Sequence, residues 1–153
     1  MDTITAPTTN GESVRSSETA ELLGKVPIFS ELSRKDLERI AGAAKEVTHR
    51  SGSTLAREGE SGVGFFLIVN GTANVDVGGT RRKQLSAGDF FGEISLLDGG
   101  PRTATVVAES DVTTIGLTQW DFKSFIEQNP SIASKMLKVM ATRLRASSQD
   151  VTH

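Results

Sequence analysis

The sequence predicts a mainly β domain of the α+β class, an antiparallel jelly roll or sandwich with helices at both ends. Three observations predict it. Between residues 48 and 117, short apolar or alternating runs are separated by glycine-containing turns, which is typical of small antiparallel sandwiches. On either side of this section, apolar residues recur at helical spacing instead. A length of 153 residues suits one domain with a real core.

The N-terminal section is expected to contain a tail and then helices. Residues 1–16 are rich in Thr, Ser, Gly and Asn and offer little to bury, so we expect a disordered tail. We expect helices over residues 17–46. In the second of them, Ser33 and Asp36 have the spacing of a capping box, and Leu37 begins its apolar face.

The central section, residues 48–117, is expected to hold six or more short strands. Val75 and Val77 alternate with polar neighbours, which is the strand period of two. The sequences VGG before Thr80 and AGD before Phe90 predict tight turns between strands. Glycine-bounded strands of this kind form hairpins, so we expect an antiparallel β-roll.

The C-terminal section, residues 118–147, is expected to be a pair of helices, followed by a flexible tail at 148–153. Thr118 can cap the first helix, and Asn129 with Pro130 can start the second, because proline suits the first helical position. The expected apolar anchors are Trp120, Phe122 and Phe125 in the first helix, and Ile132, Met136, Leu137, Met140 and Leu144 in the second.

Composition excludes several classes of function. The net charge of -2 disfavours a free-standing nucleic-acid binder, which normally shows a basic face. With no cysteine and only His49 and His153, metal sites and cupin-like metalloenzymes are disfavoured. No apolar run reaches membrane-spanning length, and the N-terminus lacks the features of a secretory signal. We therefore expect a cytoplasmic protein with no cofactor, no metal, and no direct contact with nucleic acid or membrane.

The segment FGEISLLDGGPRTATV, residues 91–106, contains residue types that are more typical of an anion-binding site than of a hydrophobic core. Gly92 would let a ligand approach the backbone, and a helical turn after it would offer N–H groups to a phosphate. Arg102 supplies a planar donor fork suited to phosphate oxygens. Ser95 and Thr103 could each add a hydroxyl donor.

Glu93 narrows the class of ligand. A phosphate repels a carboxylate beside it, but the carboxylate can accept hydrogen bonds from sugar hydroxyls, as acidic residues do in dinucleotide sites. This combination suits a cyclic nucleotide better than a triphosphate, and no Walker-type GxxxxGK[ST] is present. The structural alternative is a surface ion pair between Glu93 and Arg102, worth about 0–1 kcal/mol.

The same segment resembles the phosphate-binding cassette of cyclic nucleotide-binding domains, of the catabolite-activator and protein kinase A regulatory-subunit type. EGESGVGFFLIVNGTANV resembles the strands that precede the cassette in that family, and LSAGDFFGE resembles its entry. The resemblance covers roughly residues 20–147. Because only SQDVTH, residues 148–153, follows the last expected helix, we expect a form without a DNA-binding domain, either a stand-alone sensor or the regulatory part of a larger effector.

The resemblance implies a regulatory domain that binds cAMP or cGMP and is not an enzyme. Glu93 would bind the ribose 2′-hydroxyl and Arg102 an exocyclic phosphate oxygen, while backbone N–H groups of Gly92, Ser95 and Ala104 would add phosphate contacts. The implied ligand-binding residues are Phe91, Gly92, Glu93, Ile94, Ser95, Arg102, Thr103 and Ala104.

The resemblance says less about which base of the nucleotide is bound and which protein acts downstream. In relatives the last helix swings over the base as a lid, for which Met140, Arg143 and Leu144 are the candidates here, with Arg82 as a further base contact. Thr103 occurs at this position in relatives that prefer cGMP and in cAMP binders, so it leaves the base open. The C-terminal helices would contact a protein effector. The alternative is a non-binding interaction domain of the same fold.

Overall fold

A computed structural model describes residues 17–61 and 64–151 of the chain. The described residues form two compact units. The helical unit takes the residues up to Gly42 and those from Lys135 onward, and the β unit is Ala43–Ser134. The predicted tail at residues 1–16 lies outside the described residues.

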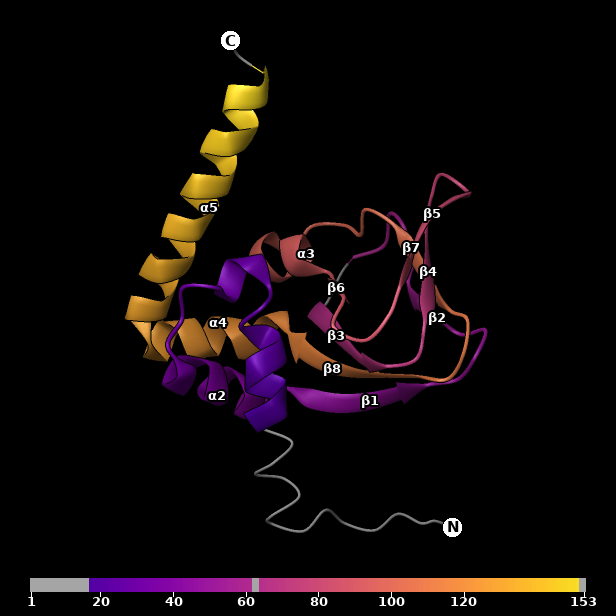
Figure 1. The fold of residues 1–153 in the computed structure, drawn as a ribbon, viewed down its shortest axis with the longest axis horizontal. Helices are drawn as coiled ribbons and strands as arrows, with labels where there is room; N and C mark the ends of the chain where they lie inside the picture. Colours follow the sequence, from indigo (N-terminus) through magenta and orange to yellow (C-terminus); the bar gives the residue numbers. More distant parts are fainter. Residues whose placement is uncertain (1–16, 62–63, 152–153) are drawn as a thin grey trace. The chain divides into compact units, whose positions relative to one another are not determined.

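The β unit contains two four-stranded antiparallel sheets, with strand orders β1-β8-β3-β6 and β2-β7-β4-β5 (Figure 1). This confirms the predicted fold class, an antiparallel sandwich flanked by helices. The strands are β1 (Lys45–His49), β2 (Thr54–Ala56), β3 (Gly64–Asn70), β4 (Ala73–Val77), β5 (Thr80–Leu85), β6 (Phe90–Phe91), β7 (Thr105–Ala108) and β8 (Val112–Thr118).

The core of the β unit is made by small and branched apolar residues. Strand alternation sends every second side chain inward, so most of these residues belong to different strands. Leu55, Val75 and Phe91 pack against this cluster while remaining partly exposed. The fully packed members are Ala56, Ile68, Ala73, Leu85, Val106, Ala108 and Val112.

The predicted hairpin turn between β4 and β5 is present. Val77 pairs with Thr80, which leaves Gly78 and Gly79 as a two-residue loop. Their φ angles are +60° and +82°, values that a tight hairpin turn requires at both central positions and that glycine adopts without strain.

The N-terminal boundary between helices and strands differs from the prediction. Helix α2 (Arg34–Ala43) ends before residue 46, and β1 already begins at Lys45. Four of the five residues of β1 are exposed, so this strand carries no apolar alternation that would have marked it in the sequence. The helices of this section are residues 17–23, the short 3-10 helix η1 (Pro27–Phe29) and α2.

The predicted capping box of α2 is confirmed. The Ser33 N–H donates to Asp36 Oδ2 at 3.3 Å, and the Asp36 N–H donates to Ser33 Oγ at 3.1 Å. Asp36 also accepts from Lys135 Nζ at 3.0 Å, which joins the two stretches of the helical unit. Burial alone would raise the pKa of Asp36, but the hydrogen bonds from Lys135 and Ser33 outweigh it and hold that pKa below its ordinary value.

The two C-terminal helices are α4 (Gln119–Gln128) and α5 (Pro130–Val151). Thr118 caps α4, because its hydroxyl accepts from the Asp121 N–H at 3.1 Å. Phe122 is buried as predicted, but Trp120 is 67% exposed and is not an anchor. Since α5 is helical to Val151, the predicted flexible tail begins too early at residue 148.

The apolar residues of α5 only partly match the predicted anchors. Ile132 and Met136 are buried, whereas Leu137 and Leu144 are 68% and 69% exposed. Among the described residues, no helix combines the length and the apolar character that crossing a bilayer would need.

Candidate functional site

A pocket in the β unit brings the predicted ligand residues together. It opens where the short helix α3 (Glu93–Asp98) and residues 102–104 face the inner side of the second sheet. From the predicted set it is lined by Phe91, Gly92, Glu93, Ser95, Arg102, Thr103 and Ala104, and otherwise by Ala56, Val75, Lys83, Leu85, Phe90 and Val106. The side chain of Ile94 is outside the described part of the structure.

Arg102 is the central charge of this pocket. Arg102 is only 8% exposed to solvent. The backbone N–H of Arg102 donates to the carbonyl of Glu60 at 2.8 Å, and the backbone carbonyl of Arg102 accepts from the Gly59 N–H at 2.9 Å. The backbone is therefore fixed on both sides of the side chain. The guanidinium carbon lies 5.8 Å from the ring centroid of Phe66, within the range of a cation–π contact.

The buried guanidinium of Arg102 is incompletely satisfied. Its Nη1 atom is buried and has no hydrogen-bond partner in the described structure. Burial lowers the pKa of this guanidinium, because desolvation disfavours the charged form, yet arginine stays protonated at neutral pH. An unpaired buried N–H of a charged group costs free energy. The alternative given by the sequence was an exposed ion pair between Glu93 and Arg102. Because the Arg102 side chain is buried, that alternative does not describe it.

Gly92 provides the space for Arg102. It precedes α3 with φ +88° and ψ 11°, in the left-handed region. A Cβ at this position would meet Arg102 Nη1 and the carbonyl oxygen of Gly64. Glycine is therefore required both by the backbone conformation and by the closeness of the guanidinium.

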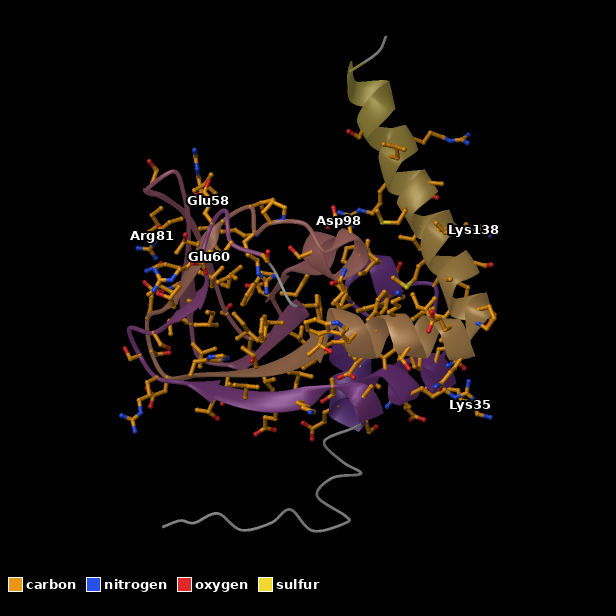
Figure 2. All side chains as sticks on the ribbon, turned by 180° about the vertical axis from the view of Figure 1, so that it is seen from behind. Lys35, Glu58, Glu60, Arg81, Asp98 and Lys138 are labelled. Atoms are coloured by element: carbon orange, nitrogen blue, oxygen red, sulfur yellow. The ribbon has the colours of Figure 1, made fainter. Side chains whose placement is uncertain are left out.

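Helix α3 forms as the sequence predicted. Leu96 is buried and anchors the helix, while Leu97 is 38% exposed. The Ser95 hydroxyl donates to the carbonyl of Gly100 at 3.2 Å, and its role as a phosphate donor stays a prediction. Asp98, labelled at the end of α3 in Figure 2, accepts from the Gly100 N–H at 2.7 Å. Ser95 and Asp98 therefore hold the loop that leads to Arg102.

The candidate base contacts lie in two different parts of the chain, β5 and α5. Arg82 does not line the pocket, whereas its neighbour Lys83 does, and the sequence had not singled out Lys83 as a contact. Met140, Arg143 and Leu144 all belong to α5 in the helical unit, and their role as a lid stays a prediction.

His49 has a structural environment. It lies in β1, and its Nε2 is 3.1 Å from the hydroxyl of Thr114. Burial lowers the pKa of this imidazole. Within residues 17–61 and 64–151, no cluster of His, Cys, Asp and Glu has the arrangement of a metal site.

Comparisons with known proteins place this geometry in a family. The model of the cyclic nucleotide-binding domain matches residues 46–129. A cyclic nucleotide-gated potassium channel of Rhizobium etli is 34% identical over 80% of this chain and 34% of its own length. A cAMP-dependent protein kinase regulatory subunit of Aspergillus niger is 36% identical over 68% of this chain and 26% of its own. The chain thus spans about a third or less of the length of these two relatives.

The fold is also found among solved structures. The N-terminal domain of a transcriptional regulator from Streptomyces coelicolor superimposes with a TM-score of 0.80 at 27% identity, covering 86% of this chain and 94% of that one. The fold of N-terminal helices, two antiparallel sheets and C-terminal helices is therefore shared with a solved relative.

Substituting Gly92 by alanine should destabilise the protein more than the same substitution at Gly52. Both glycines have nearly the same φ, +88° and +87°, but a Cβ at Gly52 would meet no atom within 4 Å. Gly52→Ala should cost about 1–2 kcal/mol from backbone strain alone. Gly92→Ala should cost about 1–3 kcal/mol more from overpacking against Arg102 and Gly64.

Urea unfolding of both variants and the parent measures this difference. If the two variants lose equal free energy of unfolding, the close packing of Arg102 on Gly92 is wrong.

Proposed function

Because the chain belongs to the cyclic nucleotide-binding domain family, we propose that its β unit binds cAMP or cGMP in the pocket beside α3 and acts as a regulatory module without catalysis. The names of two relatives, a cyclic nucleotide-gated channel and a cAMP-dependent kinase regulatory subunit, agree with such a ligand.

The observation that carries this proposal is the Arg102 side chain, a buried cation in the lining of the pocket. Arg102 places a permanent positive charge in the lining of the pocket, and that charge favours an anion from solution. A phosphate with oxygens exposed outside a ring fits the planar donor fork of arginine. The phosphate would therefore contact Arg102 at the end of the pocket formed by α3 and residues 102–104.

Glu93 supports the assignment of a ribose next to that phosphate. It is the first residue of α3, half-buried, and it lines the same pocket as Arg102. In a cyclic nucleotide the phosphate is bonded to the ribose, so a carboxylate close to the phosphate site can accept from the 2′-hydroxyl. Thr103 and Ala104 continue the lining on the other side.

A route from the pocket to α5 runs through α4. Helix α3 packs against α4, and a Cβ at Gly99 would meet the side chain of Gln119. Asn129 alone separates α4 from α5, and its N–H donates to the carbonyls of Phe125 and Ile126. We infer that binding shifts the population of α5 conformations, which a protein effector contacting α5 would sense.

Replacing Arg102 by alanine should weaken binding of cAMP and cGMP alike by about tenfold to a hundredfold or more, because charge-assisted hydrogen bonds to phosphate are worth about 1.5–3 kcal/mol. Arg81→Ala is the matched control, since Arg81 is exposed and does not line the pocket. Isothermal titration calorimetry of both variants gives the affinities, and circular dichroism checks that each is folded. Equal affinities for Arg102→Ala and the parent would refute the phosphate assignment.

Removing the ribose 2′-hydroxyl should weaken binding to the parent but have less effect on Glu93→Gln. A charged acceptor makes a stronger hydrogen bond than a neutral one, so the parent should lose about fivefold to tenfold on going to the 2′-deoxy cyclic nucleotide. The two ligands and two proteins form a double-mutant cycle. If the parent binds both ligands equally, the role of Glu93 is wrong.

Saturating cyclic nucleotide should change hydrogen exchange in residues 130–147 of α5. We expect slower exchange, because contacts made only in one arrangement of the helix favour that arrangement. Arg102→Ala at the same ligand concentration is the control for effects unrelated to binding. Unchanged exchange in α5 at saturation would contradict the coupling.

A further inference from the structure

A second cavity lies on the first sheet, at the side of its edge strand β1. Its volume is about 210 Å³, and it shares no lining residue with the pocket beside α3. Lys45 of β1 pairs with Gly116 of β8, and Gly116 pairs with Phe66 of β3, so one row across three strands forms part of the lining (Figure 1). Because directly paired residues face the same side of a sheet, all three positions open onto one space.

Two glycines leave this space open. Gly64 and Gly116 both line the cavity. A Cβ at Gly64 would meet the backbone carbonyl of Leu117, and a Cβ at Gly116 would come within 3.1 Å of Phe66 Cε1. The close packing of β3 on β8 therefore excludes side chains at both positions. The remaining lining is largely apolar, with Phe66 half-buried and Val47 39% exposed. Covering this apolar surface would remove it from water, which is favourable.

Two opposite charges face the same cavity. Lys45, on β1, and Asp121, in the first turn of α4, both line it and are both exposed. In the part of the chain that the structure describes, the Lys45 ammonium and the Asp121 carboxylate make no hydrogen bond or ion pair. Asp121 is engaged through its backbone N–H, which donates to Thr118 Oγ at 3.1 Å. Both charged groups can therefore pair with a molecule from solution.

We propose that this cavity binds a free α-amino acid with an apolar side chain. Such a molecule carries a carboxylate for Lys45 and an ammonium for Asp121, and its side chain would pack on Phe66 and Val47. The volume is sufficient for one aromatic or branched side chain, since an apolar cavity of about 150 Å³ takes a benzene molecule. The long, flexible stem of Lys45 lets its ammonium follow the carboxylate. The competing explanation is a gap left by the two glycines, with solvated charges beside it.

The test titrates three compounds into the whole chain: L-phenylalanine, phenethylamine, which lacks the carboxylate, and 3-phenylpropionate, which lacks the amino group. Two-dimensional NMR follows the backbone amides of Val47, Phe66 and Gly116. Lys45→Met should weaken the binding of phenylalanine and 3-phenylpropionate by about twofold to fivefold, as for an exposed charge pair, and leave phenethylamine unchanged. Asp121→Asn should weaken phenylalanine and phenethylamine by a similar factor and leave 3-phenylpropionate unchanged.

Lys123→Met and Glu127→Gln are the matched controls. Both residues are exposed on α4, and neither lines the cavity. The two substitutions remove one charge of each sign close to the site in sequence, so they should leave all three affinities unchanged. Circular dichroism checks that every variant is folded.

The remaining outcomes decide against the proposal. Free glycine has no side chain to fill the cavity, so at about 10 mM it should shift none of the three amides, whereas phenylalanine should shift them. No shift with phenylalanine, or an equal shift with glycine, means that the cavity is only a gap in the packing. Equal binding of the three phenyl compounds, unaffected by either variant, means that the charges do not select an amino acid. No cyclic nucleotide is present in these titrations, so their failure and that of the proposed function are distinguishable.

Discussion

The burial of the Arg102 guanidinium is the constraint on which the site depends. A buried cation is costly unless its hydrogen bonds are made, and Nη1 has no partner in the described part of the chain. The fold tolerates this cost because it surrounds the side chain closely, with the ring of Phe66 on one side and the bare backbone of Gly92 on another. For the proposed phosphate the guanidinium is already held in place, which reduces the cost of ordering it on binding.

The neighbours of Arg102 have little freedom of their own. Phe66 stacks on Phe91 with ring centroids 5.2 Å apart, and a Cβ at Gly116 would come within 3.1 Å of Phe66 Cε1. The position of the guanidinium therefore depends on contacts made across β3, β6 and β8. The pocket lining also includes Ala56, Leu85 and Val106, which belong to the core, so the proposed ligand and the packing of the sheets would share side chains.

Much of the fold was predictable because its signals are local. The capping box of Ser33 and Asp36 and the paired glycines between β4 and β5 carry their chemistry within a few residues. The motif from Gly92 to Arg102 also carries its chemistry in a short segment. What the sequence did not reveal depends on tertiary structure. Trp120 is exposed despite its size, and only the register of β5 against β4 shows that Lys83, not Arg82, lines the pocket.

The central claim is that the pocket takes a phosphate joined in a ring to a ribose. The most direct measurement is a thermal-unfolding titration with cAMP, cGMP and linear AMP. Either cyclic nucleotide at about a hundred times its dissociation constant should add about 2.7 kcal/mol and raise the melting temperature by very roughly 5–10 °C, with a smaller rise for AMP. No rise with either cyclic nucleotide at millimolar concentration, or an equal rise with AMP, would contradict the account.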